Sequence, residues 1–255
     1  MNRLLVLRYA FANGWTELRR DTWPPGWLLR IVSQAAFFAL LGELAGSAAR
    51  TEYLLIGNIV ASGVLATAIA VPQSTWDRTD GTYALLVVAP TSLLFPTVGR
   101  TLCRLVAGVA TSLAAFVVLS LLFDLPSAWP EVLGLIPLLV VTCTGAYCLM
   151  LFAGALANYA PRARNLVHNL LTMSLMAFCG VNVATSFWPE WLQMLARGLP
   201  LTHGLLAIRE LFGLGDVETI VSNALLEVLV GLVWLLLAAL AIDRMANAGR
   251  SSGSI

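Results

Sequence analysis

Few residues in this chain have side chains that could catalyse a reaction. Among its 255 residues it has two histidines, His168 and His203, four cysteines and no lysine. A zinc protease motif places two histidines on one face of a helix, and these two are far apart in the sequence. A serine–lysine dyad and a Walker A phosphate loop both require lysine, and no G-x-S-x-G turn is present. We therefore predict no catalytic, metal or cofactor site in this chain.

The cysteines are the other candidates for a metal or redox site. Cys103, Cys143, Cys148 and Cys179 all lie in apolar runs, and none belongs to a C-x-x-C pair. A cysteine in such surroundings behaves as a small apolar residue with an inert thiol. We therefore expect all of them to be buried free thiols.

Glu227 is the acidic side chain that lies well inside a strongly apolar run. A carboxylate within a membrane segment often takes part in proton or substrate movement, and it can also be held by water or by a basic partner. Both interpretations of Glu227 stay open at the level of the sequence. The two histidines fit polar positions at the membrane boundaries, with no catalytic partner beside them.

Two polar stripes follow helical spacing. Asn58 and Ser62 are four residues apart, and Asn169, Thr172 and Met176 repeat at steps of three and four. Polar side chains that face lipid are costly, so these should face protein or a cavity. Hydrogen bonding between helices and a substrate path between subunits both explain them. These five residues are our candidate substrate-path residues.

The composition defines the surroundings in which these side chains must be positioned. Hydrophobic residues make up 59% of the chain and charged residues 11%, and the mean hydropathy is +0.83. A soluble domain has about 25% charged residues, so we expect a membrane protein in contact with lipid. The net charge of +1 gives no reason to expect a nucleic-acid partner.

Apolar runs of sufficient length define the fold class. A helix needs about 20 mainly apolar residues to cross the hydrocarbon layer, and six stretches meet this requirement. They cover residues 27–45, 53–72, 102–123, 132–157, 166–187 and 222–242. They predict an all-α, polytopic fold with a six-helix transmembrane domain over 26–244. The small polar residues of 245–255 are expected to form a disordered cytoplasmic tail.

The arginines predict the orientation of the spans. Six spans place both ends of the chain on one side, and twelve of the fifteen arginines fall in the segments on that side. Positively charged residues are retained on the cytoplasmic side of a membrane. We therefore expect both termini and the connections 73–101 and 158–165 in the cytoplasm, with the protein in the plasma (inner) membrane of a bacterium.

Amphipathic segments flank the spans. Before the first span, apolar residues recur at three- and four-residue steps, namely Leu4, Leu7, Phe11, Trp15 and Leu18. They predict a cytoplasmic interface helix within 1–25 that ends at Trp23-Pro24-Pro25. Residues 180–211 hold a second, Trp-rich amphipathic region, broken at Gly198 and Pro200. We expect two short re-entrant helices there, in the outer leaflet.

Residues 77–94 connect the second and third spans. Their first half is polar and charged, and Thr79 or Asp80 could cap a helix that begins near Gly81. Pro90 and Pro96 would prevent a regular continuation of that helix, because proline lacks the backbone N–H. We predict a short cytoplasmic helix, held between two spans and suited to act as a lever on a soluble partner.

This stretch resembles a motif of the ABC-2 type permeases, the membrane subunits of one class of ATP-binding-cassette exporters. Members have a charged run followed by E-G-T, a leucine pair and T-P. The matching residues are Asp77, Arg78, Asp80-Gly81-Thr82, Leu85-Leu86 and Ala89-Pro90, with Asp80 in place of the usual Glu. The family also has a later motif: a glycine, a proline-containing outer hairpin, P-L-T and an arginine. The residues similar to it are Gly180, Pro189, Trp191-Leu192, Pro200-Leu201-Thr202 and Arg209.

The resemblance implies the type V exporter fold and a set of partners. Two permeases, identical or paralogous, would pair with two separate ATPase subunits, which hold the ATP and Mg²⁺. The stretch 77–88 would be the coupling helix, set in a groove of the ATPase. Its coupling residues would be Asp77, Arg78, Asp80, Gly81, Thr82 and Leu85. Substrates of the family include drugs, antibiotics, glycolipids and polysaccharides.

The sequence thus predicts a permease subunit that moves an amphipathic small molecule, such as a drug, an antibiotic or a lipid-like compound, out of the cell. Export of a polysaccharide or glycolipid by the same family is the alternative. A proton-coupled secondary transporter would have only Glu227 for coupling. An intramembrane enzyme would lack its catalytic residues, and a scaffold without transport activity is a further alternative.

Overall fold

The computed structural model describes residues 3–21, 24–44, 46–75, 93–123, 129–213 and 215–252. Every regular element in these ranges is a helix. The elements are α1 (Arg3–Asp21), α2 (Pro24–Leu44), α3 (Ala48–Thr67), α4 (Ala70–Ser74), α7 (Leu94–Phe123), α8 (Trp129–Ala157), η1 (Pro161–Ala163), α9 (Arg164–Phe178), η2 (Thr185–Phe187), α10 (Glu190–Arg197), α11 (Thr202–Phe212) and α12 (Val217–Ser252). This agrees with the predicted all-α class.

Four helical segments in the described part of the chain are long and apolar enough to cross a membrane. They are Ala49–Ser74, Leu94–Phe123, Val132–Ala157 and Val217–Met245. They coincide in position with the second, third, fourth and sixth predicted spans. A total of six spans stays a prediction.

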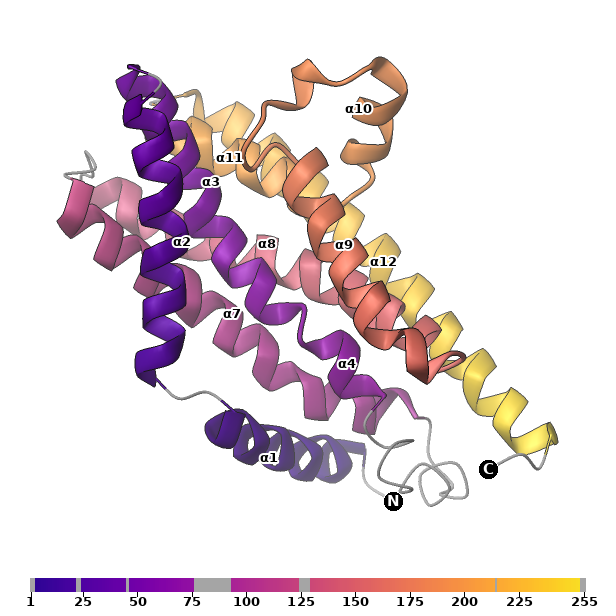
Figure 1. Cartoon of the computed structure of the whole chain (residues 1–255). Helices are drawn as coiled ribbons and strands as arrows, with labels where there is room; N and C mark the ends of the chain where they lie inside the picture. The colour runs from indigo at the N-terminus through magenta and orange to yellow at the C-terminus, as the bar shows by residue number, and fades with distance from the viewer. Residues whose placement is uncertain are drawn as a thin grey trace.

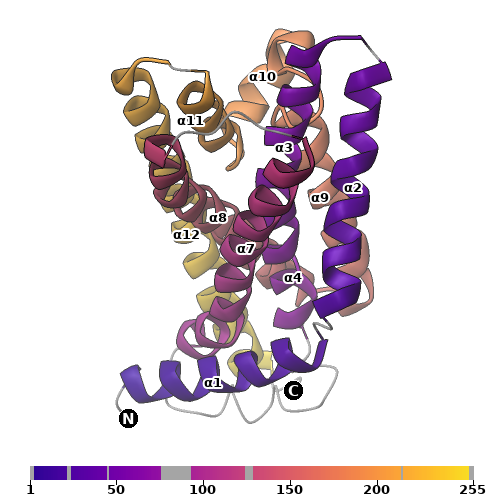
Figure 2. The same ribbon diagram turned by 90° about the vertical axis from the view of Figure 1, so that its left-hand side faces the viewer.

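The helices form one bundle with different elements at its two ends (Figure 1). The long helices α2, α3, α7, α8, α9 and α12 run between the ends. At one end α1 lies across the bundle, and α12 also ends there, whereas α10 and α11 lie at the other end (Figure 2). Helix α3 is central, because 83% of its most apolar stretch is buried, against 22% for α12.

Small residues allow the central helices to approach closely. A Cβ atom built on Gly63 of α3 would lie only 2.5 Å from the carbonyl oxygen of Gly108 in α7. Helices that pack within lipid rely on such small residues, because van der Waals contact rather than water exclusion holds them together. Gly63 therefore sets the distance between α3 and α7.

The N-terminal helix ends where the sequence predicted. Helix α1 ends at Asp21 and α2 begins at Pro24, where a missing N–H costs no hydrogen bond. One side of α1 packs on α7, and Gly14 has no room for a side chain there, since a Cβ would lie 2.9 Å from the carbonyl carbon of Arg100. Leu4 and Tyr9 remain 76% and 73% exposed. Of the predicted apolar stripe, Leu4 and Trp15 are exposed, whereas Leu7, Phe11 and Leu18 are partly buried, and a position in the membrane interface stays a prediction.

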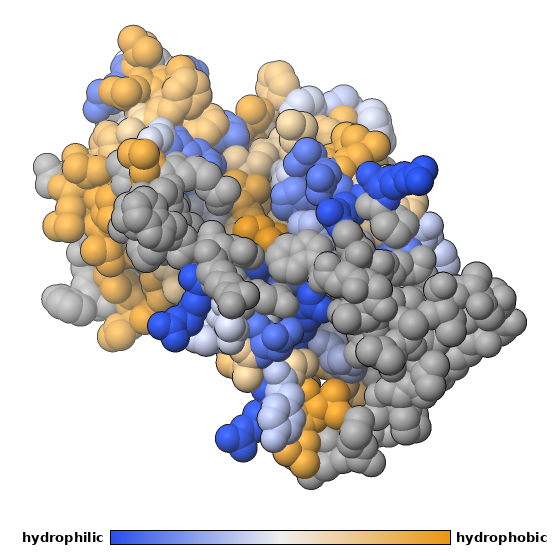
Figure 3. All heavy atoms as spheres, turned by 60° about the horizontal axis from the view of Figure 1, so that its bottom comes forward, coloured by the Kyte–Doolittle hydropathy of each residue, from blue (hydrophilic) through white to orange (hydrophobic). Residues whose placement is uncertain are grey.

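The surface at the α1 end is mixed. Figure 3 brings this end forward and shows hydrophobic residues at the upper left and hydrophilic residues nearer the middle and the lower edge. Exposed apolar side chains also cover much of the long helices, including Phe37, Val117 and Leu236. A large exposed apolar surface is what a lipid-embedded protein presents.

Three predicted boundaries were wrong. The α-helix in the region of the predicted fifth span, 166–187, covers only Arg164–Phe178, because the chain turns at Gly180, which has a φ of +87°. Helix α7 begins at Leu94 rather than at 102, with Pro96 in its first turn, where proline is tolerated. The predicted disordered tail, 245–255, is helical up to Ser252, and Met245 packs on a small apolar cluster with Ile242.

Candidate substrate path

An open groove runs along α9 and contains part of the predicted polar stripe. Its volume is about 440 Å³, and it is lined by Leu65, Thr172, Met173, Met176, Ala177, Asn182, Val183 and Trp188. Thr172 and Met176 were predicted from their helical spacing. Asn169, on the same helix, is exposed but does not line the groove. We call this cavity the α9 groove.

Asn58 lies behind the wall of the α9 groove. Its side-chain amide donates to Asn182 Oδ1 at 3.1 Å, and Gln34 of α2 donates to its carbonyl oxygen at 3.3 Å. The Asn58 side chain is buried, with 2% of its surface exposed. Asn58 therefore connects α2, α3 and the segment after α9, and it positions Asn182 rather than lining the groove itself.

Ser62, the other predicted residue of α3, bonds within its own helix. Its hydroxyl donates to the Ile59 carbonyl oxygen at 2.7 Å. Thr172 likewise donates to the carbonyl oxygens of His168 and Asn169, which satisfies its hydroxyl while its side chain borders the groove. The structure thus places Thr172 and Met176 together at the groove, Asn58 and Ser62 inside the bundle, and Asn169 outside.

Asn182 and Trp188 are groove residues that the sequence did not single out as such. Asn182 was counted inside a predicted span, and Trp188 was treated as a boundary anchor. The chain after Gly180 folds back instead, so that the Trp188 indole donates to the Ala177 carbonyl oxygen at 3.2 Å and its ring meets Phe178 edge-on. The sequence signal for this turn was Gly180, with the polar Asn182 two residues later, near the end of the apolar run.

Two residues of the later motif, Gly180 and Arg209, meet at Tyr53. The Arg209 guanidinium lies 3.4 Å from the centre of the Tyr53 ring and donates to the carbonyl oxygens of Tyr53 and Val181. The Tyr53 hydroxyl donates to the Gly180 carbonyl oxygen at 2.8 Å. Burial lowers the pKa of Arg209 to about 10, so the guanidinium is still charged at neutral pH. This contact joins α11 to α3.

Glu227 caps a helix. Its carboxylate is fully buried and accepts hydrogen bonds from the backbone N–H groups of Leu201 at 2.7 Å and Gly204 at 2.9 Å. These N–H groups lie at the start of α11, where a helix has no internal partners for them and favours negative charge. The sequence suggested water or an arginine as the structural partner of Glu227, and the structure shows backbone N–H groups in their place.

The segment between α10 and α11 has a strained backbone and is held by hydrogen bonds to α12 and to α10. Leu201 has a φ of 96°, a conformation that a residue with a side chain rarely adopts. Its N–H bonds Glu227, and the hydroxyl of the next residue, Thr202, donates to the Ala196 carbonyl oxygen at 2.6 Å. The predicted break between two short helices is therefore present, and α11 begins at a fixed point.

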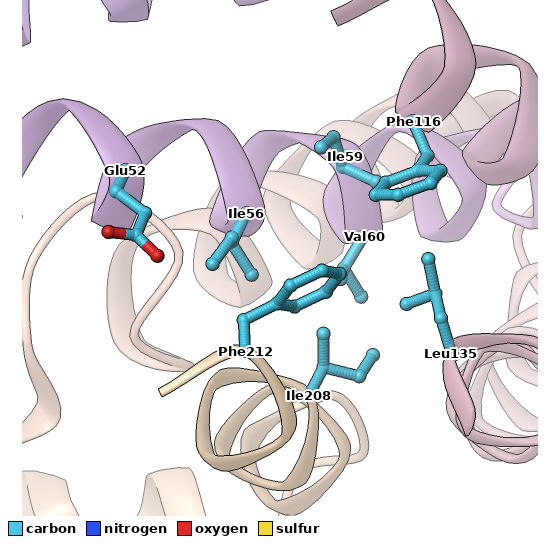
Figure 4. Close-up of a pocket in the computed structure, with 8 residues that line it drawn as sticks. All are labelled: Glu52, Ile56, Ile59, Val60, Phe116, Leu135, Ile208 and Phe212. Atoms are coloured by element: carbon cyan, nitrogen blue, oxygen red, sulfur yellow. The ribbon is translucent and has the colours of Figure 1, made fainter. Parts of the chain in front are cut away.

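A second apolar space shows how α11 packs into the bundle (Figure 4). Ile208 and Phe212 of α11 face α3, α7 and α8 across it, and the Phe116 and Phe212 rings are 5.9 Å apart. The space holds about 10 Å³, which is about the minimum for one water molecule. It is a packing gap and has no room for a substrate.

At the opposite end, three helices hold α4. Asn158, just after α8, donates to the Ser74 carbonyl oxygen at 3.2 Å, and Arg104 of α7 donates to the Gln73 side chain at 2.9 Å. His168 of α9 bonds the Ala68 carbonyl oxygen at 3.0 Å, at the break between α3 and α4. The sequence did not indicate these contacts, because each joins residues far apart in the chain.

Helix α4 leads directly into the predicted coupling segment. That segment lies outside the described residues, and so do all six predicted coupling residues. They are Asp77, Arg78, Asp80, Gly81, Thr82 and Leu85. Their role stays a prediction.

The cysteines lie inside the bundle. All four cysteines are free and buried, as expected for inert thiols. Within the described residues, no three side chains of His, Cys, Asp or Glu come together in a way that could hold a metal ion.

The bundle of apolar helices defines the class as a membrane protein with helical spans. Comparison with protein families gives the particular family: the model described as "ABC-2 type transporter" matches residues 10–212. The chain therefore belongs to the ABC-2 type transporter family and is a membrane component for transport rather than a catalytic subunit. The match extends from α1 to the last residue of α11. A search of curated proteins found no match.

Proposed function

We propose that this chain is the permease subunit of an ABC exporter that moves an amphipathic small molecule out of the cell, such as a drug, an antibiotic or a lipid-like compound. ATP hydrolysis on a separate nucleotide-binding subunit would drive transport. Membership of the family supports the class of transporter. The α9 groove is the observation that supports the class of substrate.

The side chains of the α9 groove suit a molecule with both polar and apolar parts. Met173, Met176 and Trp188 offer flexible or flat apolar surfaces, which adapt to molecules of different shape. Thr172 and Asn182 supply a hydroxyl and an amide at one side. A few polar groups in a mainly apolar cavity orient a ligand without requiring a single chemical structure.

The α9 groove also favours a pair of permeases. Met173 is 69% exposed, so the groove is open along one side of the chain. A second permease, identical or paralogous, would close that side and complete the path. Two ATPase subunits would then serve the pair, one at each coupling segment.

The contacts of α4 support a route for the ATP-driven movement. The predicted coupling helix at 77–88 follows α4, which is bonded to α7, to the end of α8 and, through the break before it, to α9. A movement of the ATPase at this segment would therefore reach the α9 groove. The α1 end would face the cytoplasm of a bacterial cell, in agreement with the arginine count.

A groove-filling substitution tests this proposal. Met176→Trp should lower ATP-dependent export of a fluorescent amphipathic dye about tenfold, in inside-out vesicles that contain the permease and its ATPase, because the indole occupies the path. Leu236→Trp, on the exposed face of α12, is the matched control and should export normally. Equal export by both variants would show that the α9 groove is not the substrate path. A native protein that exports no amphipathic probe would contradict the proposed function.

A further inference from the structure

A second groove lies at the end of the bundle opposite α1, between α10, α11 and α12. Its volume is about 550 Å³, and it is lined by Thr185, Gln193, Arg197, Thr202, His203, Leu206, Asn223 and Leu226. It shares no residue with the α9 groove. We call it the Arg197 groove.

The Arg197 groove lies at a membrane boundary. Asn223 and Leu226 belong to the first turns of the candidate span Val217–Met245, so the polar part of the groove is next to the start of the apolar surface. From Leu226, an exposed apolar row continues along α12. Leu229, Val233 and Leu236 are 57%, 56% and 62% exposed, at spacings that keep them on one face of the helix.

The polar part of the groove has one charged side chain, and it is positive. Among the eight lining residues, Arg197 is the one with a formal charge, and none is acidic. Glu227 follows Leu226 in the chain, but its carboxylate is directed to the backbone of Leu201 and Gly204. A guanidinium beside neutral donors favours an anionic group, above all a phosphate, which it can bind through two parallel hydrogen bonds.

The neutral donors are held in fixed positions. The Gln193 side-chain amide donates to the Trp188 carbonyl oxygen at 2.8 Å, and that of Asn223 donates to the Thr219 carbonyl oxygen at 3.0 Å. Each primary amide has a second N–H. Because the first one is bonded to the backbone, the side chain is oriented before any ligand binds.

His203 adds a nitrogen whose bonding capacity is unused. The ring lines the groove, and its Nε2 donates to the Arg197 carbonyl oxygen at 3.1 Å. That bond makes Nε2 the protonated atom of the neutral ring. The other ring nitrogen, Nδ1, is buried and has no hydrogen-bond partner within the described structure. A buried polar atom without a partner is uncommon. Because Nε2 holds the proton, Nδ1 can only accept a hydrogen bond, so the partner that fits it is a donor, such as a hydroxyl of a lipid headgroup, and not a phosphate oxygen.

We propose that the Arg197 groove binds the phosphate headgroup of an anionic membrane lipid, with an acyl chain along Leu226, Leu229 and Val233. The charge favours the phosphate, and the exposed row on α12 favours a chain attached to it. Basic pockets between membrane helices bind lipid headgroups in this way. The site requires that α12 is embedded in lipid and does not depend on the export activity or on the ATPase.

Native mass spectrometry can test the site. The purified chain, in detergent, would be given equal amounts of phosphatidylglycerol and phosphatidylcholine with identical acyl chains. We expect one phosphatidylglycerol to be retained per chain, with affinity lowered about tenfold by Arg197→Gln. The matched control is Arg50→Gln, because Arg50 is exposed in the first turn of α3, which begins at the end of the bundle where α10 lies, and it is outside the groove. This control should bind like the native chain.

A second variant keeps the test independent of one side chain. Asn223→Asp would place a carboxylate in the groove while Arg197 is kept, and it should weaken phosphatidylglycerol binding to a similar extent. Both variants should unfold at the native temperature in phosphatidylcholine alone, which separates loss of the lipid from loss of the fold. Native-like binding of phosphatidylglycerol by either folded variant, or equal retention of phosphatidylcholine by the native chain, would overturn the proposal.

Glycerol phosphate distinguishes a lipid site from a site for any phosphate ester. Because the acyl chain contributes contact along α12, glycerol phosphate at the same concentration should displace little of the bound phosphatidylglycerol. Complete displacement at equal concentration would show that the site binds a soluble anion and would contradict the lipid assignment.

Discussion

At the scale of single residues, Glu227 shows why a charge in a membrane helix need not belong to a transport mechanism. The sequence left a proton or substrate role open. The carboxylate instead accepts two backbone N–H groups from the start of α11. A negative charge at a helix start is stabilised by the helix dipole and by direct hydrogen bonds. The sequence could locate this residue, but its partners lie more than twenty residues earlier in the chain and could not be inferred.

Removal of the Glu227 carboxylate should destabilise the protein. Glu227→Leu leaves two buried N–H groups without acceptors, and each costs about 1–3 kcal/mol. We expect a loss of about 2–5 kcal/mol in the free energy of unfolding, measured by denaturant titration in detergent. Glu218→Gln, at an exposed position of the same helix, should change stability by less than about 0.5 kcal/mol. A stable Glu227→Leu protein with impaired export would instead indicate a transport role.

At the scale of elements, the predicted helices were found where apolar length alone decides the structure. The candidate span Val132–Ala157 has the predicted bounds, because its apolar run is long enough to stay helical although Pro137 lies within it. The end of α9 was mispredicted because the residues after Gly180 are apolar enough to continue a span. The break between α3 and α4 was also missed, since the His168 contact that satisfies the Ala68 carbonyl oxygen comes from a distant helix.

The hydrogen bond between His168 of α9 and the break between α3 and α4 should be needed to couple ATP hydrolysis to export. His168→Phe keeps a flat ring but removes the donor to the Ala68 carbonyl oxygen, so the segment before the coupling region loses its bond to α9. We expect the reconstituted complex to keep its ATP hydrolysis rate while export falls several-fold. Asn165→Ala, at an exposed position of the same helix, should leave both rates unchanged. Export that is unaffected in His168→Phe would exclude this route.

At the scale of the whole molecule, both ends of the chain lie at the end of the bundle that α1 crosses, and α10 lies at the other end (Figure 1). An even number of membrane crossings would place both ends on one side in this way; which side faces the cytoplasm stays a prediction from the arginines. Neither the packing of α11 into the bundle nor the α9 groove could be predicted, because both depend on where the chain folds back after Gly180. The residues of α9 were found by their spacing, whereas Asn182 was found only in the structure.

Cysteine labelling tests the orientation of the molecule. All four native cysteines are buried, so an introduced exposed thiol should be the reactive one. Leu4 in α1 and Trp191 in α10 are 76% and 59% exposed. A membrane-impermeant maleimide should label Trp191→Cys in intact spheroplasts and Leu4→Cys only after lysis, with the native chain unlabelled throughout. The reverse pattern would invert the predicted topology.

The two attachments of α11 have a consequence for how such a protein opens. Its first residues are bonded to α12 through Glu227, and Arg209, near its last turn, is bonded to α3 through Tyr53. Helix α11 therefore links α3, in the centre of the bundle, to α12, which lies at its surface. This link holds α3 and α12 at a fixed separation at this end of the bundle. A substrate exit is therefore not expected to form by separation of these two helices. For the pair of permeases proposed above, we expect the passage to the outside to open between the two chains, with α11 of each chain keeping both attachments.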